Sequence, residues 1–234
     1  MTDPVVHDRQ SFEDQGATFL RAQKAQSEYD YAANRPPHSS RLVGKTITLA
    51  HRDDAGRFRH VFSESEVRAE ILAGPGAGSA SEASYEAFEM APDVFFVSFL
   101  SSPDHSVAMA LDLSSGAATV VLGELTDNGI ICTVAAARIE EADGQAAGQA
   151  AVPYHRPYSL GGTRFRQLYA DNVVYEHIYL TGVYETWLGV KGPQAGQADT
   201  EEYFAFKIRD GVYLLYWNEG ILTAQMTFLF NFFD

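Results

Sequence analysis

The residues best suited to chemistry stand together in one short segment, 174–180, in which side chains of different character alternate. Successive side chains of a β-strand point to opposite faces, so Tyr175, His177 and Tyr179 would share one face and Glu176 the other. An imidazole beside phenolic hydroxyls can carry a proton near neutral pH. The segment predicts an acid–base site on this face; the alternative is that the three side chains pack against a neighbouring strand or subunit.

Aromatic and basic side chains near this segment suggest how a ligand would be held. Tyr169, Trp187 and Tyr216 supply amphipathic aromatic surface, which suits a flat ligand and equally suits a barrel core. Lys191 precedes a Gly-Pro pair after a short apolar run, which predicts a rim position where its ammonium group either meets an anionic group or faces solvent. We therefore expect a small aromatic or apolar ligand.

Two carboxylates complete the candidate set. Asp210 lies beside a turn, where an aspartate most often bonds its own backbone, and Glu219 stands at the predicted end of a strand. Either could serve as a general base or as a plain turn residue. The predicted catalytic residues are His177, Tyr175, Tyr169 and Asp210, and the predicted substrate-binding residues are Trp187, Tyr179, Lys191, Tyr216 and Glu219.

Sequence signatures of metal and nucleotide sites do not occur. The seven histidines are scattered without HxH or HExxH spacing, and a single cysteine, Cys132, rules out a four-thiolate zinc site. There is also no GxxxxGK[ST] phosphate loop and no GxSxG nucleophile elbow. We therefore expect chemistry that needs no metal and no cofactor.

The charge balance limits the partners. There are 17 Lys and Arg residues against 31 Asp and Glu, giving a formal net charge of −14, and no stretch gathers the basic residues into a patch. Nucleic acid and anionic membranes are therefore not expected partners. No cationic and apolar leader follows Met1, which favours a cytoplasmic protein. The apolar run 226–233 predicts either a core strand or the contact of a homodimer.

Most of the chain reads as short antiparallel strands after one leading helix. The helix is predicted from Ser11 to Ala33 and is ended by two prolines. The strands are runs of β-branched and aromatic residues between Gly, Asp, Asn and Pro. They are Lys45–His51, Arg57–Ser63, Val67–Leu72, Ser84–Met90, Val94–Leu100, Val107–Leu113, Ala117–Leu122, Arg164–Ala170, Val173–Leu180, Tyr184–Gly189, Glu202–Ile208, Val212–Asn218 and Leu222–Phe232.

The two series of strands resemble each other in order. Leu42–Ile47 matches Leu160–Phe165, Tyr85–Met90 matches Glu202–Lys207, and Pro92–Phe99 matches Arg209–Tyr216. The alternative is that any two meanders of alternating strands look alike. Closure into a barrel would hide the edges of each meander. The sequence thus predicts a mainly β protein with a helical segment at 1–38, a first barrel half at 39–142, a linker at 143–156 and a second barrel half at 157–234.

The first half carries a different set of polar residues. His51, His60, Arg59, Arg68 and Asp93 are more charged and less aromatic than the candidates of the second half. In the overlay of the two halves His60 matches position 176, so it is expected on the face opposite to that of His177, as a surface histidine. Two cavities, if both exist, would differ in chemistry.

Several stretches resemble the molybdenum cofactor biosynthesis protein F (MoaF) family. They are the YEHIYL run at 175–180, the Lys191-Gly192, Ala195-Gly196 and Ala198-Asp199-Thr200 positions, and, less specifically, the Phe95–Phe99 run. The resemblance covers most of the chain from Leu42 onward. It implies a calycin-like β-barrel architecture in two related halves, and the family name implies a link to a pathway without stating a reaction.

A looser similarity connects the second half to the phenolic acid decarboxylases, which are cofactor-free calycin-type barrels. Tyr169 and Tyr175 match two tyrosines of those enzymes, and Asp210 is an approximate match for their glutamate. Gln167 stands where a further tyrosine would be, and Trp187 falls near the position of their arginine. This similarity implies a shared scaffold with different chemistry.

Two functions follow from these observations. The first is a cofactor-free lyase or isomerase that acts on a small aromatic or apolar substrate through tyrosine, histidine and carboxylate groups. The second is a non-catalytic, lipocalin-like binding protein or an accessory factor linked to molybdenum cofactor metabolism. An enzyme needs ionisable groups aimed at its ligand, whereas a carrier needs only orienting hydrogen bonds.

Overall fold

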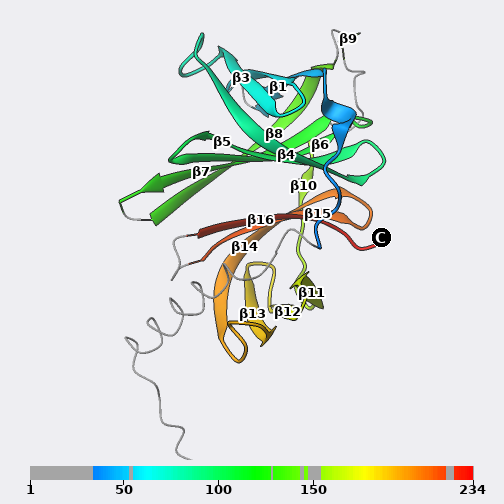
Figure 1. The fold of residues 1–234 in the computed structure, drawn as a ribbon, viewed down its shortest axis with the longest axis vertical. Coiled ribbons are helices and arrows are strands. Elements are labelled where there is room, and N and C mark those ends of the chain that lie inside the picture. The colour runs from blue at the N-terminus through cyan, green and yellow to red at the C-terminus, as the bar shows by residue number, and fades with distance from the viewer. Residues whose placement is uncertain are drawn as a thin grey trace, which may run out of the picture. The chain divides into compact units, whose positions relative to one another are not determined.

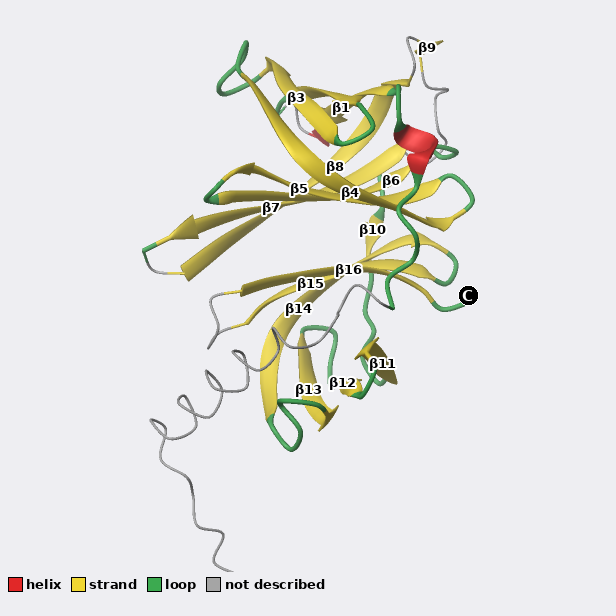
Figure 2. Ribbon diagram, viewed as in Figure 1, coloured by secondary structure: helices red, strands yellow, loops and turns green. Residues whose placement is uncertain are grey.

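The computed structural model describes residues 34–52, 55–127, 129–142, 145–146, 154–219 and 224–233. Strands and the turns between them make up nearly all of this part of the chain, with one short 3-10 helix, η1 (Ser40–Leu42) (Figure 2). The mainly β architecture is therefore confirmed. The predicted helix Ser11–Ala33 lies outside the described residues.

The first half is a closed antiparallel barrel. Its strands are β1 (Thr46–His51), β2 (Arg57–Phe62), β3 (Glu66–Ala73), β4 (Ala80–Ala91), β5 (Val94–Ser102), β6 (His105–Asp112), β7 (Ala117–Thr126), β8 (Gly129–Ala142) and β9 (Gln145–Ala146) (Figure 1). Neighbours in sequence pair along the sheet, and β1 also pairs with β8. This last pairing closes the barrel and removes the edges of β1 and β8.

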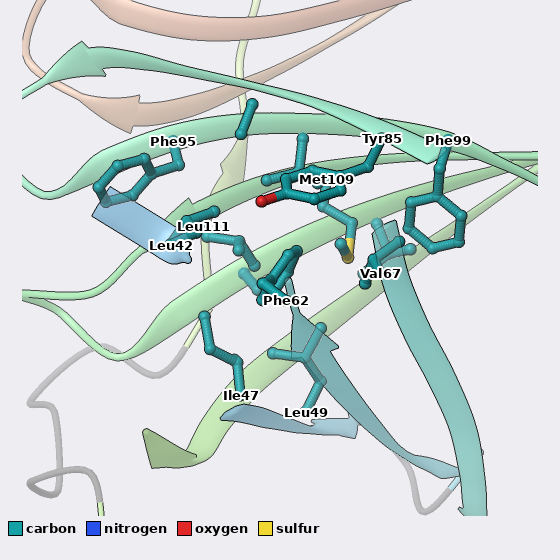
Figure 3. Packing of buried hydrophobic residues seen from close by; sticks show 14 of the residues in the cluster. Leu42, Ile47, Leu49, Phe62, Val67, Tyr85, Phe95, Phe99, Met109 and Leu111 are labelled. Atoms are coloured by element: carbon teal, nitrogen blue, oxygen red, sulfur yellow. The ribbon is translucent and has the colours of Figure 1, made fainter. Parts of the chain in front are cut away.

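The barrel interior is apolar. Every second residue of its strands points inward, as for Ile47 and Leu49 on β1, which are 1% and 0% exposed. Phe62, Phe95 and the other labelled side chains meet inside the ring of strands (Figure 3). Burial of this much apolar surface is the main stabilising contribution to such a barrel.

The second half is an open antiparallel sheet. Its strands are β10 (Arg156–Pro157), β11 (Arg164–Ala170), β12 (Val173–Tyr179), β13 (Tyr184–Lys191), β14 (Ala198–Arg209), β15 (Val212–Glu219) and β16 (Ala224–Asn231). They follow the order β11-β12-β13-β14-β15-β16, with β10 paired to β14. Within the described residues no pairing joins β11 to β16, so this half is a half-barrel.

The two halves contain backbone hydrogen bonds at equivalent positions, which shows that their local structures are similar. Ala77 N–H bonds Gly74 O at 3.2 Å in the β3–β4 turn, and Ala195 N–H bonds Gly192 O at 3.1 Å in the β13–β14 turn. Both glycines have a positive φ, of 101° and 102°, which a residue with a Cβ adopts only with strain.

Equivalent side-chain hydrogen bonds also occur in both halves. The hydroxyl of Tyr85 donates to Ser63 O at 2.9 Å, and that of Tyr203 donates to Thr181 O at 3.0 Å. Two unrelated meanders would not share these contacts at matching positions, so the prediction of two similar halves is confirmed.

By contact density the chain forms two compact units that do not follow the two halves. One contains β11, β12 and β13 (residues 162–180 and 185–200), and the other contains the first barrel together with residues 201–234. The boundaries at 142 and 157 stay a prediction.

The larger unit has a second core, which joins the first barrel to the C-terminal strands. Val94, Ala110 and Val121 of the barrel pack with Val212 and Leu214 of β15. All five side chains are at most 3% exposed. The two sequence halves therefore share one hydrophobic core in this unit.

A buried ion pair lies in the same unit. Arg209 donates Nε–H and Nη2–H to the carboxylate of Asp112, at 3.0 and 2.6 Å, and Nη1–H to Pro92 O at 2.8 Å. Burial acts to raise the pKa of Asp112, which is 1% exposed, but hydrogen bonds from Arg209 and Ser115 outweigh it and lower the pKa to about 2. The carboxylate is therefore ionised and fully hydrogen-bonded in the folded protein.

The described residues include no helix with the length and hydropathy needed to cross a bilayer.

Candidate acid–base site on strands β11–β13

The candidate site lies on one face of β11–β13, the face of His177, which we call the inner face. On β12 it carries Tyr175, His177 and Tyr179, which are 8%, 2% and 1% exposed. The strand register sets Phe165 of β11 and Trp187 of β13 on either side of His177. The predicted alternation of β12 thus places these side chains together.

A chain of three polar side chains runs across this face. His177 Nδ1 lies 3.2 Å from Oε2 of Glu185, and His177 Nε2 lies 3.4 Å from the hydroxyl of Tyr169. Glu185 is 0% exposed, so water does not compete for its contact with the imidazole. We call these three residues the Glu185–His177–Tyr169 relay. It connects a buried carboxyl group to a phenol through both nitrogens of one imidazole.

Aromatic rings surround the relay. The ring centroid of Tyr175 lies 5.0 Å from that of Tyr169 and 5.9 Å from that of Trp187, both in edge-to-face geometry. Phe165 stacks on Tyr179 at 5.6 Å. The Tyr175 hydroxyl donates to Oε1 of Gln194, a residue of the β13–β14 turn. These contacts fix the rings on the two sides of His177.

Two acceptors on the inner face receive no hydrogen bond from any residue that the structure describes. They are Oε1 of Glu185 and Oε1 of Gln167, which is directly opposite Tyr175 in the β11–β12 register. A buried acceptor without a donor costs roughly 1–3 kcal/mol. Both atoms would therefore be stabilised by a ligand that supplies N–H or O–H groups.

The outer face of the same strands carries a separate ion cluster. Arg164 donates to both oxygens of Glu176, at 2.8 and 2.7 Å, and Arg166 lies 3.3 Å from Oε1. The hydrogen bond from Arg164 is the main reason why the pKa of Glu176 is lowered. These charges stay on the face opposite to His177.

Sequence reasoning missed three residues of the site: Glu185, Gln194 and Gln167 as a functional side chain. The signal for Glu185 is its alternation with Trp187 on a strand, which puts a carboxyl group on the aromatic face. Gln194 comes from a turn, and only the folded structure brings it to Tyr175.

The remaining predicted site residues lie elsewhere. Lys191 is exposed at the end of β13, and Asp210 is an exposed turn residue paired with Lys207. Tyr216 packs in the second core and stacks on Phe204 at 4.7 Å, and burial raises its pKa to about 12.

Glu219 accepts the indole N–H of Trp217 at 3.0 Å, on β15. Asp210, Tyr216 and Glu219 thus lie apart from the relay along the chain, whereas Lys191 ends the strand that carries Glu185. The roles of all four stay predictions.

In the first half, the position equivalent to His177 holds His60. His60 is opposite Ile47 and Ala69 in its register, as His177 is opposite Phe165 and Trp187. It is 5% exposed, so the expectation of a surface histidine matched to position 176 is wrong. A one-residue slip in an alternating strand inverts the face of every side chain.

The environment of His60 differs from that of His177. Val67 occupies the position where the second half has Glu185, and no residue in the described part of the chain forms a hydrogen bond with Nδ1 of His60. Burial, with a smaller contribution from His51, lowers the pKa of His60 to about 4. His60 is therefore neutral at physiological pH.

In the part of the chain that the structure describes, no three His, Cys, Asp or Glu side chains come close enough to hold a metal ion.

The fold and the site define a β-protein of two related antiparallel halves, a barrel and a half-barrel, of which the second carries the Glu185–His177–Tyr169 relay. A model of the MoaF N-terminal domain matches residues 28–127, and a model of the MoaF C-terminal domain matches residues 155–233. The chain belongs to the MoaF family.

Solved structures add a distant similarity. A protein from Burkholderia vietnamiensis, described as a candidate beta-lactamase, is 20% identical over 45% of this chain and 99% of its own, with a TM-score of 0.35. Comparison with curated proteins gives no match.

Proposed function

We propose that the second half is a cofactor-free lyase or isomerase that acts on a small aromatic or apolar substrate. The observation that carries this proposal is the Glu185–His177–Tyr169 relay, in which a buried carboxyl group, an imidazole and a phenol are in sequence. Activation of one polar group by a base that a third group orients is a common arrangement in acid–base catalysis.

The relay sets the direction of proton transfer. With Glu185 ionised, Nδ1–H of His177 donates to its carboxylate, which leaves Nε2 as the acceptor. The Tyr169 hydroxyl then donates to Nε2. When His177 takes that proton, the Tyr169 oxygen becomes a base that can remove a proton from the substrate. Tyr169 then delivers the proton that it took to another atom of the substrate, a second carbon in an isomerisation or the leaving group in an elimination. His177 returns its own proton to the Tyr169 oxygen, which restores the relay.

The inner face also favours a class of ligand. The oxygens of Glu185 and Gln167 that accept no hydrogen bond within the described chain favour a ligand with donor groups. The surrounding rings favour an aromatic or apolar body. The arginines of these strands, Arg164 and Arg166, are paired with Glu176 on the opposite face. A neutral or cationic aromatic alcohol, phenol or amine therefore fits better than an aromatic carboxylate.

The first test is a thermal-shift screen with phenols, aryl alcohols and aryl amines, each beside its carboxylate analogue. A compound that binds the native state raises the melting temperature. We expect donor-bearing neutral or cationic compounds to stabilise the protein more than the carboxylates. Consumption of the best compounds is then followed by chromatography.

Single-atom variants connect binding to chemistry. Tyr169→Phe removes only the phenolic oxygen, so it should retain ligand binding and lose about 10²- to 10⁴-fold in turnover. Tyr184→Phe, which changes an exposed tyrosine on β13, is the matched control and should keep full turnover. Equal turnover in the two variants would contradict the relay.

The second candidate is a non-catalytic binding protein or an accessory factor linked to molybdenum cofactor metabolism. Two observations favour it. His177 and Glu185 are buried, so that only the Tyr169 hydroxyl of the relay could reach a ligand, and the chain matches the MoaF C-terminal domain. Under this function the stabilising compound is recovered unchanged, and Tyr169→Phe alters nothing but affinity.

A further inference from the structure

A cavity of about 270 Å³ lies on the first barrel and has no part in the relay. Its lining comes from the strands β1, β2, β3 and β8 and from the segment before β10. The lining residues are Ala50, His51, Gly56, Arg57, Ala73, Arg138, Glu140 and Tyr154. The volume is slightly below the range of sites for drug-sized ligands, so it suits a smaller molecule.

The strand register explains why a hollow forms here. Ala50 of β1 is directly opposite Arg57 on β2 and Arg138 on β8, so one methyl group lies between two long side chains. The two arginines stand two strand spacings apart, or about 10 Å at their backbones. Ala73, on the far side of Arg57, is also small. The small residues leave space that the two guanidinium groups border.

The guanidinium groups are already arranged around one carboxylate. Glu140 accepts Nε–H of Arg57 and Nη2–H of Arg138, both at 2.8 Å, through different oxygens. The hydrogen bond from Arg138 is the largest of the effects that lower the pKa of Glu140. The bond to Glu140 engages one of the five N–H groups of Arg57.

Rings form the other walls of the cavity. Tyr154 lines it, and the guanidinium carbon of Arg52 lies 5.4 Å from the centroid of the Tyr154 ring. His51 packs on Phe58 at 4.4 Å, and burial lowers its pKa. A third arginine thus adjoins the cavity, in a chain whose formal net charge is −14.

We propose that this cavity is a binding site for a small planar carboxylate with an aromatic body. The carboxylate binds the guanidinium fork of Arg57 and the side chain of Arg138, and the aromatic body lies against Tyr154. Planar bidentate geometry is what a guanidinium group offers to a carboxylate. The site is independent of the proposed function of the second half, which favours neutral or cationic ligands.

Benzoate is the probe, measured by isothermal titration calorimetry on the full chain at low ionic strength. Its neutral isostere benzamide and inorganic phosphate are titrated in parallel. We expect benzoate to bind more tightly than either. Benzamide binding as tightly as benzoate would overturn the role of the arginines, and phosphate binding more tightly than benzoate would overturn the aromatic carboxylate as the ligand class.

Four variants locate the site. Arg57→Gln should weaken benzoate binding by about tenfold, because one charge-assisted contact is lost. Arg59→Gln is the matched control: Arg59 is on the same strand and face, is similarly exposed and pairs with Glu70 outside the cavity. It should leave affinity within about twofold. Equal losses in the two variants would overturn the site.

The third variant is expected to strengthen benzoate binding, an effect that a misfolded protein would not produce. Glu140→Gln removes the carboxylate that shares both arginines, so benzoate should bind several-fold more tightly. Weaker binding would contradict the proposal. His177→Gln should bind benzoate as the unchanged chain does, and a loss confined to that variant would assign benzoate to the second half instead.

Discussion

His60 and His177 hold equivalent positions in the two halves, but their neighbours differ. In the first half the imidazole lies near the rings of Phe62 and Phe99, and Val67 holds the position equivalent to Glu185. Nδ1 of His60 forms no hydrogen bond with the residues that the structure describes. The second half gives the equivalent nitrogen the carboxyl group of Glu185.

Other equivalent positions are also apolar in the first half and polar in the second. Tyr179 and Tyr175 occupy the places of Phe62 and Phe58, as the registers of β2 and β12 show. The same backbone therefore supports an apolar barrel interior in one half and a hydrogen-bonded polar face in the other. Fold and site chemistry are thus separable within a single chain.

The largest expected effect tests the apolar interior of the first half. Phe62→Ala should lower the free energy of unfolding by about 3–5 kcal/mol, because a fully buried ring is lost and a cavity remains. Val61→Ala, one residue away on the outer face, should change it by less than about 0.5 kcal/mol. Urea denaturation measures both variants. Similar losses would mean that the alternation of β2 does not separate core from surface.

A smaller effect tests the isolated histidine. The pKa of His60 is about 4 in the folded state and about 6.5 when unfolded. Between these values the unfolded state binds the proton more tightly, so stability is full above about pH 6.5 and falls as the pH drops towards 4. The expected loss is about 3 kcal/mol. His60→Leu should remove this part of the pH dependence, as measured by urea denaturation from pH 7 to pH 4.

One substitution would make the first half resemble the second. Val67→Glu places a carboxyl group where the second half has Glu185, and an opposite charge nearby should raise the pKa of His60 above its present value of about 4. Val67→Gln has nearly the same shape without the charge and should not raise it. Imidazole NMR signals report the titration. An equal response to both variants would show that the two positions are not equivalent.

The smallest effect concerns the relay itself. A double-mutant cycle with His177→Phe and Glu185→Leu should give a coupling energy of about 1 kcal/mol, since each variant removes one partner of a buried hydrogen bond. The corresponding cycle with His60→Phe and Val67→Ala has no hydrogen bond to lose, so its coupling should be smaller. Urea denaturation of the single and double variants provides the values. A cycle without coupling at His177 would remove the basis of the relay.

Most strands could be predicted from the sequence because residues such as Val, Ile, Phe and Tyr alternate along them. The exceptions are the two-residue strands β9 and β10 and the long strand β8, which closes the barrel. Its middle is Ala135-Ala136-Ala137, and alanine has little preference for strands. Hydrogen bonds to β7 and β1 hold β8 in the sheet. The pairing with β1 joins segments far apart in the sequence, so local composition does not reveal it.

The candidate site could be predicted only in part, for a similar reason. The alternation on β12 correctly predicted that Tyr175, His177 and Tyr179 share a face. Glu185 could not be assigned to His177, because the contact depends on the β12–β13 register. His60 was set on the wrong face since the turn after β11 is shorter than the turn after β1, which shifts the overlay by one residue.

The second core has a consequence for how this protein could have arisen and how it unfolds. Leu214 and Val212 bury their side chains against Val94 and Val121, and Arg209 neutralises Asp112. A gene fragment that ends in the linker would therefore leave apolar surface exposed on the remaining barrel and would remove the arginine that pairs with the Asp112 carboxylate. The first repeat is thus expected to depend on the last three strands of the second and to melt together with them, as a single cooperative transition rather than two.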